Sequence, residues 1–308
     1  MASRDFYSVT EFISNNMFVV KQRLIWFILS AILLIASLYS MYTYGFKLSI
    51  DFKGGTLTEI HYEGDRPAKE DIEQSIATND FGGFSVRPTG ETGYVIRTRE
   101  LSETEKESLS ASLSGGAIER QTTIGPTAGA ELQSKALKAI LVVVLMIVLF
   151  ITFAFRKVSK PVASWKYGLA TIIALAHDVI IQTGLFVYLG HVSGMEIDLL
   201  FVTGLLAILG YSVHDSIVVF DRVRENLTTR SSNEEFEVTV GKSVNQTFAR
   251  SINTSLTILI TLVALYIFGS LATQSFALLL IVGLIAGTYS SIFVASPLLV
   301  TFYNWQKK

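Results

Sequence analysis

The segment Ile197–Phe220 reads IDLLFVTGLLAILGYSVHDSIVVF. It is long and apolar enough to cross a bilayer as an α-helix, since a span needs roughly 20 mostly apolar residues. Its second half nevertheless contains His214 and Asp215, two ionisable residues that are costly to place in hydrocarbon. The segment therefore predicts an α-helical membrane protein whose charges inside the membrane serve a function.

Five other segments resemble this one in length and hydropathy. Together they predict six transmembrane helices, at residues 24–46, 136–155, 167–189, 197–220, 252–268 and 276–303. The last five form a predicted bundle over residues 136–303. Half of the 308 residues are hydrophobic and the mean hydropathy is positive, at +0.46, a combination that is rare in a soluble domain of this size. The first apolar run is longer than a usual signal-peptide core, so we predict an uncleaved anchor.

Lysine and arginine are unevenly distributed among the short loops. The loops Gly190–Asp198 and Gly269–Ser275 contain neither residue. The alternate loops and the two ends contain Arg4, Lys21, Arg23, Arg156, Lys157, Lys160, Lys166, Arg222, Arg224, Arg230, Lys242, Lys307 and Lys308. Because cytoplasmic loops are enriched in basic residues, the stub 1–23 and the tail 304–308 are predicted to be cytoplasmic.

Residues 47–135 form a polar stretch on the predicted outer side, between the first two helices. Alternating β-rich residues predict strands at 56–62, 84–87, 94–98 and 117–124. Apolar spacing predicts a helix at 69–77, and the pair Ser102 and Glu105 predicts a capping box that opens a second helix. The order β-α-β-β-α-β is that of a small α+β, ferredoxin-like extracytoplasmic domain.

Three places in the predicted helices carry ionisable residues. His177 and Asp178 lie in the third helix, His214 and Asp215 in the fourth, and Arg250 at the start of the fifth. A carboxylate in hydrocarbon must be paired, hydrated or protonated. Asp215 and Arg250 lie on consecutive helices near the same membrane face, so they pair or share a water-filled cavity. The alternative is that these groups only join helices through polar contacts.

Other patterns limit the functional classes. Gly283 and Gly287, four residues apart on the sixth helix, predict close helix packing. The sequence has no cysteine and no G-x-S-x-G, H-E-x-x-H or Walker motif, so we predict neither an enzyme nor a cofactor. The two His–Asp pairs do not have a recognised metal-binding spacing. A net charge of −1 gives no indication of nucleic-acid binding.

Four motifs resemble the SecD/SecF family of protein-export membrane proteins, within the RND transporter superfamily. They are DFKGGT at 51–56, GPTAGAEL at 125–132, ALAHD at 174–178 and GYSVHDSIVVFDRVREN at 210–226. The residues that carry the resemblance include Asp51, Gly54, Gly55, Thr56, Gly210, Tyr211, Ser212, Asp221 and Arg222. The chain length and single outer domain resemble the SecF branch, rather than SecD or a fused SecDF. The family often has Asn where this chain has His214.

The resemblance implies a multi-pass protein of a prokaryotic plasma (inner) membrane, with SecD as its partner. It also implies work with the SecYEG channel and the SecA motor, in which an ion gradient of H⁺ or Na⁺ promotes preprotein translocation and release on the outer side. The family's ion pathway falls on Asp215 and Arg250, and we add His214, His177 and Asp178 as candidates. Two other functions stay open: half of an RND-type lipid or drug exporter, and a passive subunit for translocon assembly.

Overall fold

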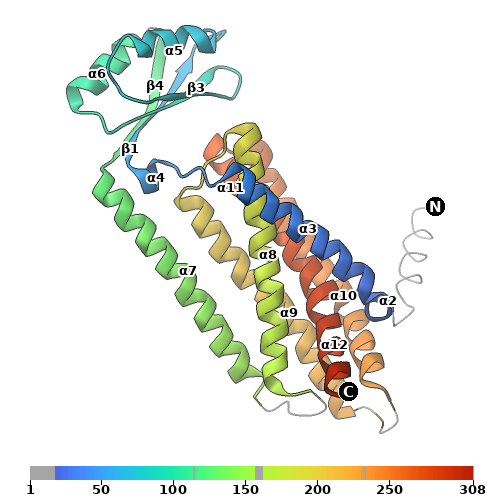
Figure 1. Cartoon of the computed structure of the whole chain (residues 1–308). Helices are drawn as coiled ribbons and strands as arrows, with labels where there is room; N and C mark the ends of the chain where they lie inside the picture. Colours follow the sequence, from blue (N-terminus) through green and yellow to red (C-terminus); the bar gives the residue numbers. More distant parts are fainter. Residues whose placement is uncertain (1–17, 114, 157–161, 230, 232–233, 308) are drawn as a thin grey trace, which may run out of the picture.

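The computed structural model describes residues 18–113, 115–156, 162–229, 231 and 234–307. It consists of a bundle of long helices with a small α+β domain at one end (Figure 1). The predicted fold class is therefore confirmed. Five of the basic residues used for the orientation, namely Arg4, Lys157, Lys160, Arg230 and Lys308, lie outside the described residues.

The α+β domain has the ferredoxin-like order of elements. Its sheet is antiparallel, with the strand order β2-β3-β1-β4. The hydrophobic core lies between one face of the sheet and the two helices, and includes Ile60, Ile72, Ile76, Ile96 and Leu109. The elements are β1 (Gly55–Tyr62), α5 (Lys69–Ala77), β2 (Ser85–Thr89), β3 (Gly93–Thr98), α6 (Glu103–Ser112) and β4 (Gly116–Ile124).

Helix α6 begins at the capping box that the sequence predicts. The Ser102 amide donates to Glu105 Oε2 at 2.8 Å, and the Glu105 amide donates to Ser102 Oγ at 3.4 Å. The guanidinium of Arg99 donates to Glu105 Oε1 at 2.5 Å. These bonds stabilise the ionised carboxylate and lower the pKa of Glu105 to about 2. The hydrogen bond from Arg99 has the largest effect.

We expect Glu105→Gln to loosen α6 at neutral pH. Because the pKa of Glu105 is lower in the folded than in the unfolded state, its stabilising effect is present above about pH 4.5 and is lost as the pH falls to about 2. Hydrogen exchange of the α6 amides in the purified chain measures this effect at both ends of that range. Glu103→Gln is the control, since Glu103 is exposed and its one ion pair among the described residues is with Lys106, three residues on. Equal protection in wild type and Glu105→Gln at pH 7 contradicts the expectation.

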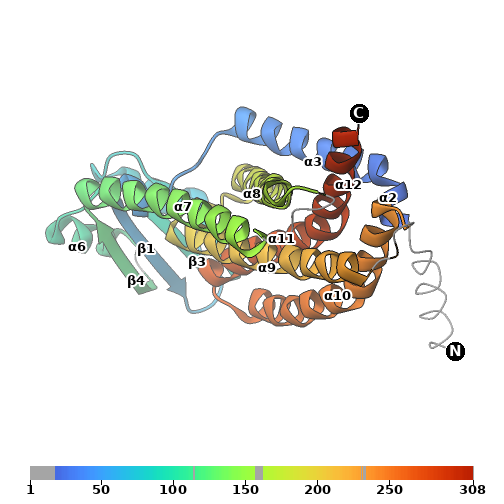
Figure 2. The same ribbon diagram turned by 90° about the horizontal axis from the view of Figure 1, so that it is seen from below.

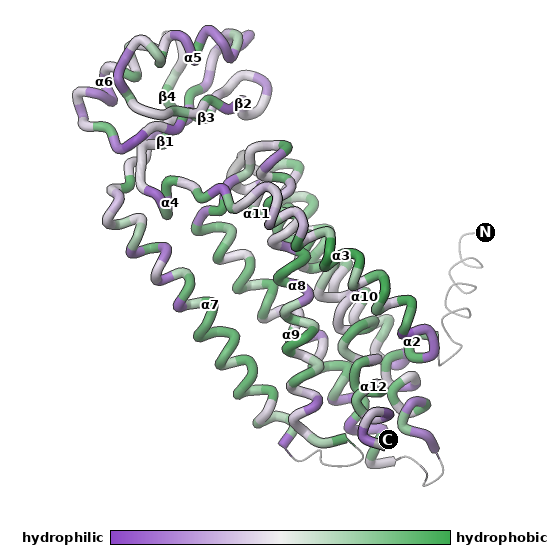
Figure 3. The backbone as a smooth tube through the Cα atoms, viewed as in Figure 1, coloured by the Kyte–Doolittle hydropathy of each residue, from purple (hydrophilic) through white to green (hydrophobic). Residues whose placement is uncertain are grey.

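Six helical segments in the described part of the chain are long and apolar enough to cross a membrane. Figure 3 shows their hydrophobic middles and the more hydrophilic α+β domain. The bundle elements are α2 (Phe18–Lys21), α3 (Arg23–Tyr44), α7 (Pro126–Ala154), α8 (Ser164–Ser193), α9 (Leu199–Thr229), α10 (Phe236–Phe268), α11 (Leu271–Ser290), the π-helix η1 (Ser291–Ala295) and α12 (Ser296–Lys307). The short helix α4 (Ile50–Lys53) lies between α3 and β1.

Several helices run past the predicted membrane segments, because apolar runs mark only the part in hydrocarbon. Helix α10 begins at Phe236, so Arg250 lies well inside it rather than at its start. Helix α7 begins at Pro126, so residues 126–135 belong to this helix and not to the α+β domain. The sixth predicted span is interrupted by η1, a π-helical turn that apolar spacing does not reveal.

Helices α8 and α9 and the span formed by α11, η1 and α12 make up the centre of the bundle. In their most apolar windows 50%, 56% and 61% of the residues are buried, against 11% in α7 and in α10. Figure 2, the view from below, shows α8 between α3 and α9, with α10 at the edge of the bundle. The helix that carries Asp215 is thus central, whereas its neighbour α10 has a wide uncovered face.

Candidate functional site

The candidate site is a small cavity between α9 and α10. Four residues of α9 at the spacing i, i+3, i+4 and i+7, and so on one side of the helix, line this cavity: Tyr211, His214, Asp215 and Val218. Helix α10 contributes Arg250, Ser251 and Thr254. The cavity has a volume of about 190 Å³, which is enough for several water molecules.

Asp215 is the most deeply buried charged residue of this cavity, with 6% of its surface exposed. Its Oδ1 accepts a hydrogen bond from Ser251 Oγ at 2.6 Å. Its Oδ2 is also buried but has no hydrogen-bond partner among the described residues. An ionised carboxylate with an unsatisfied oxygen is unfavourable inside a membrane, so a water molecule or a proton is needed there.

Arg250 and His214 lie at the open side of the cavity. Both side chains are exposed in this chain, although both positions are inside apolar helices. No ion pair joins Arg250 to Asp215 within the part of the chain that the structure describes. Of the two arrangements left open by the sequence, pairing or a shared cavity, the geometry favours the shared cavity.

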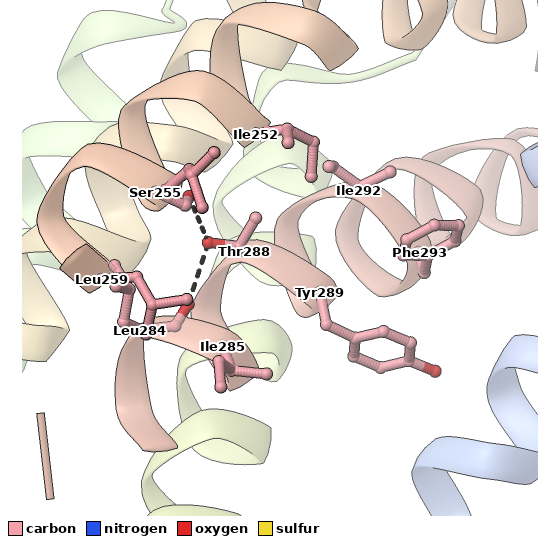
Figure 4. Close-up of a pocket in the computed structure, with 10 residues that line it drawn as sticks. Ile252, Ser255, Leu259, Leu284, Ile285, Thr288, Tyr289, Ile292 and Phe293 are labelled. Carbon is pink, nitrogen blue, oxygen red and sulfur yellow. Dashed lines mark hydrogen bonds between the residues drawn. The ribbon is translucent and has the colours of Figure 1, made fainter. Parts of the chain in front are cut away.

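A series of hydroxyl groups connects this site to α11. Tyr211 Oη lies 2.7 Å from Ser255 Oγ, which lies 2.6 Å from Thr288 Oγ1. Thr288 in turn donates to the carbonyl of Leu284 at 2.9 Å, as Figure 4 shows. Beyond these groups lies a groove of about 290 Å³ with an apolar lining, from Ile252 on α10 to Phe293 on η1. The series of hydroxyl groups therefore ends at a hydrophobic surface. We assign no ion-binding or catalytic role to this groove.

His177 and Asp178 form a second, separate cluster. Asp178 is fully enclosed and accepts hydrogen bonds from Ser212 Oγ at 2.5 Å, Ser290 Oγ at 2.8 Å and His177 Nδ1 at 3.0 Å. His177 Nε2 is buried without a hydrogen-bond partner among the described residues. Ser212 and Asp215 lie on different sides of α9, toward α8 and toward α10. The structure thus brings His214, Asp215 and Arg250 together and places His177 and Asp178 elsewhere.

The two small residues of the sixth span lie at close helix contacts. A Cβ atom at Gly283 would lie 2.7 Å from Gln182 Nε2 and 2.7 Å from a side-chain carbon of Ile208. A Cβ atom at Gly287 would lie 3.0 Å from the Cβ atom of Ser212. Gly283 and Gly287 therefore allow α11 to approach α8 and α9, the helices that carry both polar clusters.

The DFKGGT segment forms the joint between the bundle and the α+β domain. Asp51 Oδ2 accepts a hydrogen bond from the backbone amide of Leu199, the first residue of α9, at 2.9 Å. Gly54 and Gly55 have positive φ angles of 78° and 134°, which other residues rarely adopt. Thr56 Oγ1 accepts from the Leu101 amide at 3.1 Å within the domain. These contacts give each motif residue a structural role at the joint.

The remaining motif residues lie at the opposite end of the bundle or on open surface. Asp221 and Arg222 are partly or wholly exposed and pair with Arg224 and Glu225 of the same helix, at 2.9 and 2.8 Å. Gly210 has open space around its missing side chain. Among the described contacts, none joins Gly210, Asp221 or Arg222 to the cluster around Asp215 or to the cluster around Asp178.

Sequence reasoning missed Ser251, the one described hydrogen-bond donor to Asp215. Serine and threonine recur along α10 at Thr247, Ser251, Thr254 and Ser255, which is close to helical spacing. This repeat, on a helix next to the one with the carboxylate, was the available signal. It does not say which of these hydroxyl groups faces α9.

Comparisons with known proteins match nearly the whole chain. A family model described as "Protein export membrane protein SecD/SecF, C-terminal" matches residues 105–305, and one described as "SecD/SecF GG Motif" matches residues 39–65. A protein translocase subunit SecF from Thermobaculum terrenum is 41% identical over 93% of this chain and 94% of its own length. One from Anaerolinea thermophila is 35% identical over 94% and 97%. These relatives are named as translocase subunits and not as enzymes.

Solved structures of SecDF also resemble this chain. The SecDF structure from Thermus thermophilus, described as a translocon-associated membrane protein, is 31% identical with a TM-score of 0.79. The match covers 96% of this chain and 38% of the SecDF chain, so this chain spans well under half of that protein. A super-membrane-facing form of SecDF matches with 34% identity and a TM-score of 0.63. The arrangement of this chain is therefore closer to the first of these structures.

Proposed function

The chain is a SecF subunit of the SecD/SecF family of protein-export membrane proteins. From this membership and from the geometry of the site, we propose that it uses an ion gradient to promote preprotein export. The chain is a multi-pass membrane protein. The observation that carries the proposal is Asp215, a buried carboxylate with one unsatisfied oxygen beside a polar cavity. Such a group inside a membrane is typical of ion pathways.

Asp215 is the group that binds and releases the coupling ion, and we take this ion to be a proton rather than Na⁺. When Asp215 is ionised, the Ser251 hydroxyl and the nearby Arg250 stabilise the negative charge across the cavity. Protonation removes that charge and weakens its attraction to the arginine. The relative free energies of two packings of α9 against α10 then change, which shifts the population between them.

The change reaches the α+β domain through the two chain segments that connect it to the bundle. These are 51–56, which leads from α4 into β1, and 125–132, which leads from β4 into α7. The domain then alternates between arrangements that hold and release an unfolded preprotein on the outer side. SecYEG and SecA are the channel and motor with which this cycle works.

The uncovered face of α9 and α10 supports SecD as the direct partner. His214, Arg250 and Thr254 are exposed there, although they lie in helices that cross the membrane. Polar and charged side chains within a membrane face protein or water rather than lipid. A partner chain with its own polar residues at this face completes the cavity. We place both chain ends in the cytoplasm and the α+β domain outside a prokaryotic plasma membrane, as the basic loops indicate.

The two other functions lead to different results. Half of a lipid or drug exporter would form a complex with a chain other than SecD, which mass spectrometry of the purified complex detects. A passive assembly subunit would lose export on truncation but keep it when Asp215 is neutralised. Preprotein release from membrane vesicles that contain the complex, with and without an imposed proton gradient, separates the coupling function from the passive one.

We expect Ser251→Ala to weaken coupling without abolishing it. The variant removes the one described donor to Asp215, and a hydrogen bond to a charged group contributes about 1.5–3 kcal/mol. The gradient-dependent rate of release should therefore fall by about tenfold or more. Thr257→Ala is the control, because the Thr257 hydroxyl donates to the Asn253 carbonyl within α10 and Thr257 is not among the residues that line the cavity. Equal gradient-dependent rates in Ser251→Ala and wild type would show that this contact is not needed.

A further inference from the structure

The loop between α8 and α9 makes an ionic contact with the α+β domain. Glu196 in this loop lies 3.0 Å from Arg97 Nε and 3.4 Å from Arg87 Nη2. The side chain of Glu196 is 12% exposed, and those of Arg97 and Arg87 are 20% and 25% exposed. The pairs are thus largely removed from solvent, where charges interact more strongly than on an open surface.

Strand geometry explains why the two arginines face the bundle. Arg87 on β2 and Arg97 on β3 follow the buried residues Val86 and Ile96, which belong to the core under α5 and α6. Successive residues of a strand point to opposite faces of the sheet, so both arginines point away from this core. Burial lowers the pKa of Arg97, and the charge of Glu196 opposes this effect.

The backbone beside Glu196 is joined to the segment that follows α3. The Ser49 amide donates to the Ile197 carbonyl at 2.9 Å, and the Ile197 amide donates to the Lys47 carbonyl at 2.8 Å. Two residues further on, Asp51 accepts a hydrogen bond from the Leu199 amide at 2.9 Å. We call Asp51, Arg87, Arg97 and Glu196 the domain clamp. It fastens the start of α9 both to the joint and to the sheet.

The clamp is a local contact in an otherwise open boundary. One cavity of about 280 Å³ borders the clamp itself, and another of about 320 Å³ lies between the sheet and the α10–α11 loop. The residues of this sheet face therefore do not pack continuously against the bundle. A movement of the bundle can tilt the domain about such a contact more easily than about a broad packed interface.

Helix α9 makes the clamp relevant to coupling. The same helix carries Asp215 in the membrane and is capped at its first turn by two carboxylates. Asp198 Oδ1 accepts from the Phe201 amide at 2.7 Å, and Asp51 caps the Leu199 amide. A helix is stiff along its axis, so a shift of α9 at Asp215 also displaces its capped end.

We propose that Glu196 is a positioning residue that transmits movement of α9 to the α+β domain through Arg87 and Arg97. This inference rests on the proposed function, because it assumes that the gradient moves the domain. It adds a non-covalent connection to the two chain segments that join the parts. Without Glu196, α9 moves but the domain follows less closely.

The test uses the complex with its SecD partner in membrane vesicles. Glu196→Gln keeps the shape of the side chain and removes its charge. We expect the gradient-dependent rate of preprotein release to fall by about tenfold, within the range for residues that couple two sites. Release without a gradient and the amount of co-purified partner should stay unchanged. Glu119→Gln is the control, because Glu119 is exposed on β4 beside the neighbouring cavity and is in no described ion pair.

A chemical bridge distinguishes transmission from a merely structural role. The chain has no cysteine, so Arg97→Cys with Glu196→Cys gives this subunit two reactive thiols, and a cysteine-free partner keeps the reaction specific. The unbridged double variant should be as poorly coupled as Glu196→Gln. A short bifunctional thiol reagent should restore gradient-dependent release, since it replaces the ion pair by a covalent connection.

Two results would overturn the inference: full coupling in Glu196→Gln, or a bridged double variant that stays uncoupled. Asp215→Asn is measured in the same vesicles to keep the two proposals apart. If Asp215→Asn removes gradient dependence while Glu196→Gln keeps it, the proposed function stands and the domain clamp is wrong. If Asp215→Asn keeps gradient dependence, the proposed function itself fails.

Discussion

Asp215→Asn should abolish the gradient-dependent part of preprotein release and leave the gradient-independent part intact. Asparagine has the shape of aspartate and can still accept the hydrogen bond from Ser251, so the packing of α9 against α10 is kept. It cannot ionise, however, and the interaction across the cavity no longer changes with protonation. Release from vesicles with and without an imposed proton gradient measures both parts.

The control for this variant is Asp178→Asn. Asp178 accepts three described hydrogen bonds, and the structure separates it from the cavity of Asp215. An asparagine there replaces one acceptor oxygen by an amide, so we expect reduced stability with some gradient dependence retained. Normal gradient-dependent release by Asp215→Asn, with loss in Asp178→Asn, would move the ion pathway to the His177–Asp178 cluster.

Gly184→Ala should produce the largest loss of stability among single-atom additions to the bundle. A Cβ atom at Gly184 would overlap the backbone and Cβ of Ser37 on α3, and would lie only 2.8 Å from the Ser37 carbonyl oxygen. Ser40 on α3 also donates to the Gly184 carbonyl at 2.8 Å. Overpacking of this kind costs about 1–3 kcal/mol, and a backbone cannot rotate away as a side chain can.

The thermal midpoint of the purified chain in detergent measures this effect. Gly168→Ala is a matched control on the same helix, because its Cβ atom would meet its nearest neighbour, Thr152 Oγ1, at an ordinary 3.7 Å. Alanine favours a helix over glycine by about 1 kcal/mol, so the control should be neutral or stabilising. An unchanged midpoint in Gly184→Ala would mean that α3 does not depend on this close contact.

The elements that the sequence predicted well are those set by local patterns. Six apolar runs identify six spans because lipid requires long apolar helices. The alternation in β1 and the capping box at Ser102 identify the α+β domain because both signals need only a few neighbouring residues. The fold class was confirmed for this reason, while the ends of α7 and α10 were not visible in hydropathy.

The details of the site depend on contacts between distant parts of the chain. Which residue of α10 faces Asp215 is set by the rotation of that helix against α9, so Ser251 could not be chosen over Ser255 from spacing alone. The same holds for Glu196, whose partners Arg87 and Arg97 lie about one hundred residues earlier in another domain. The π-helix η1 is likewise not marked by composition; its first residue, Ser291, contacts Ser216 of α9 through their hydroxyl groups at 2.9 Å.

The central claim is that Asp215 takes up and releases a proton in the assembled complex. Infrared difference spectroscopy of the complex in membranes, recorded while the pH is lowered, measures protonation of buried carboxyl groups directly. The account predicts a carboxyl band in wild type that is absent in Asp215→Asn and still present in Asp178→Asn. An identical band in wild type and Asp215→Asn would contradict the account, because the titrating carboxyl group would then be another one.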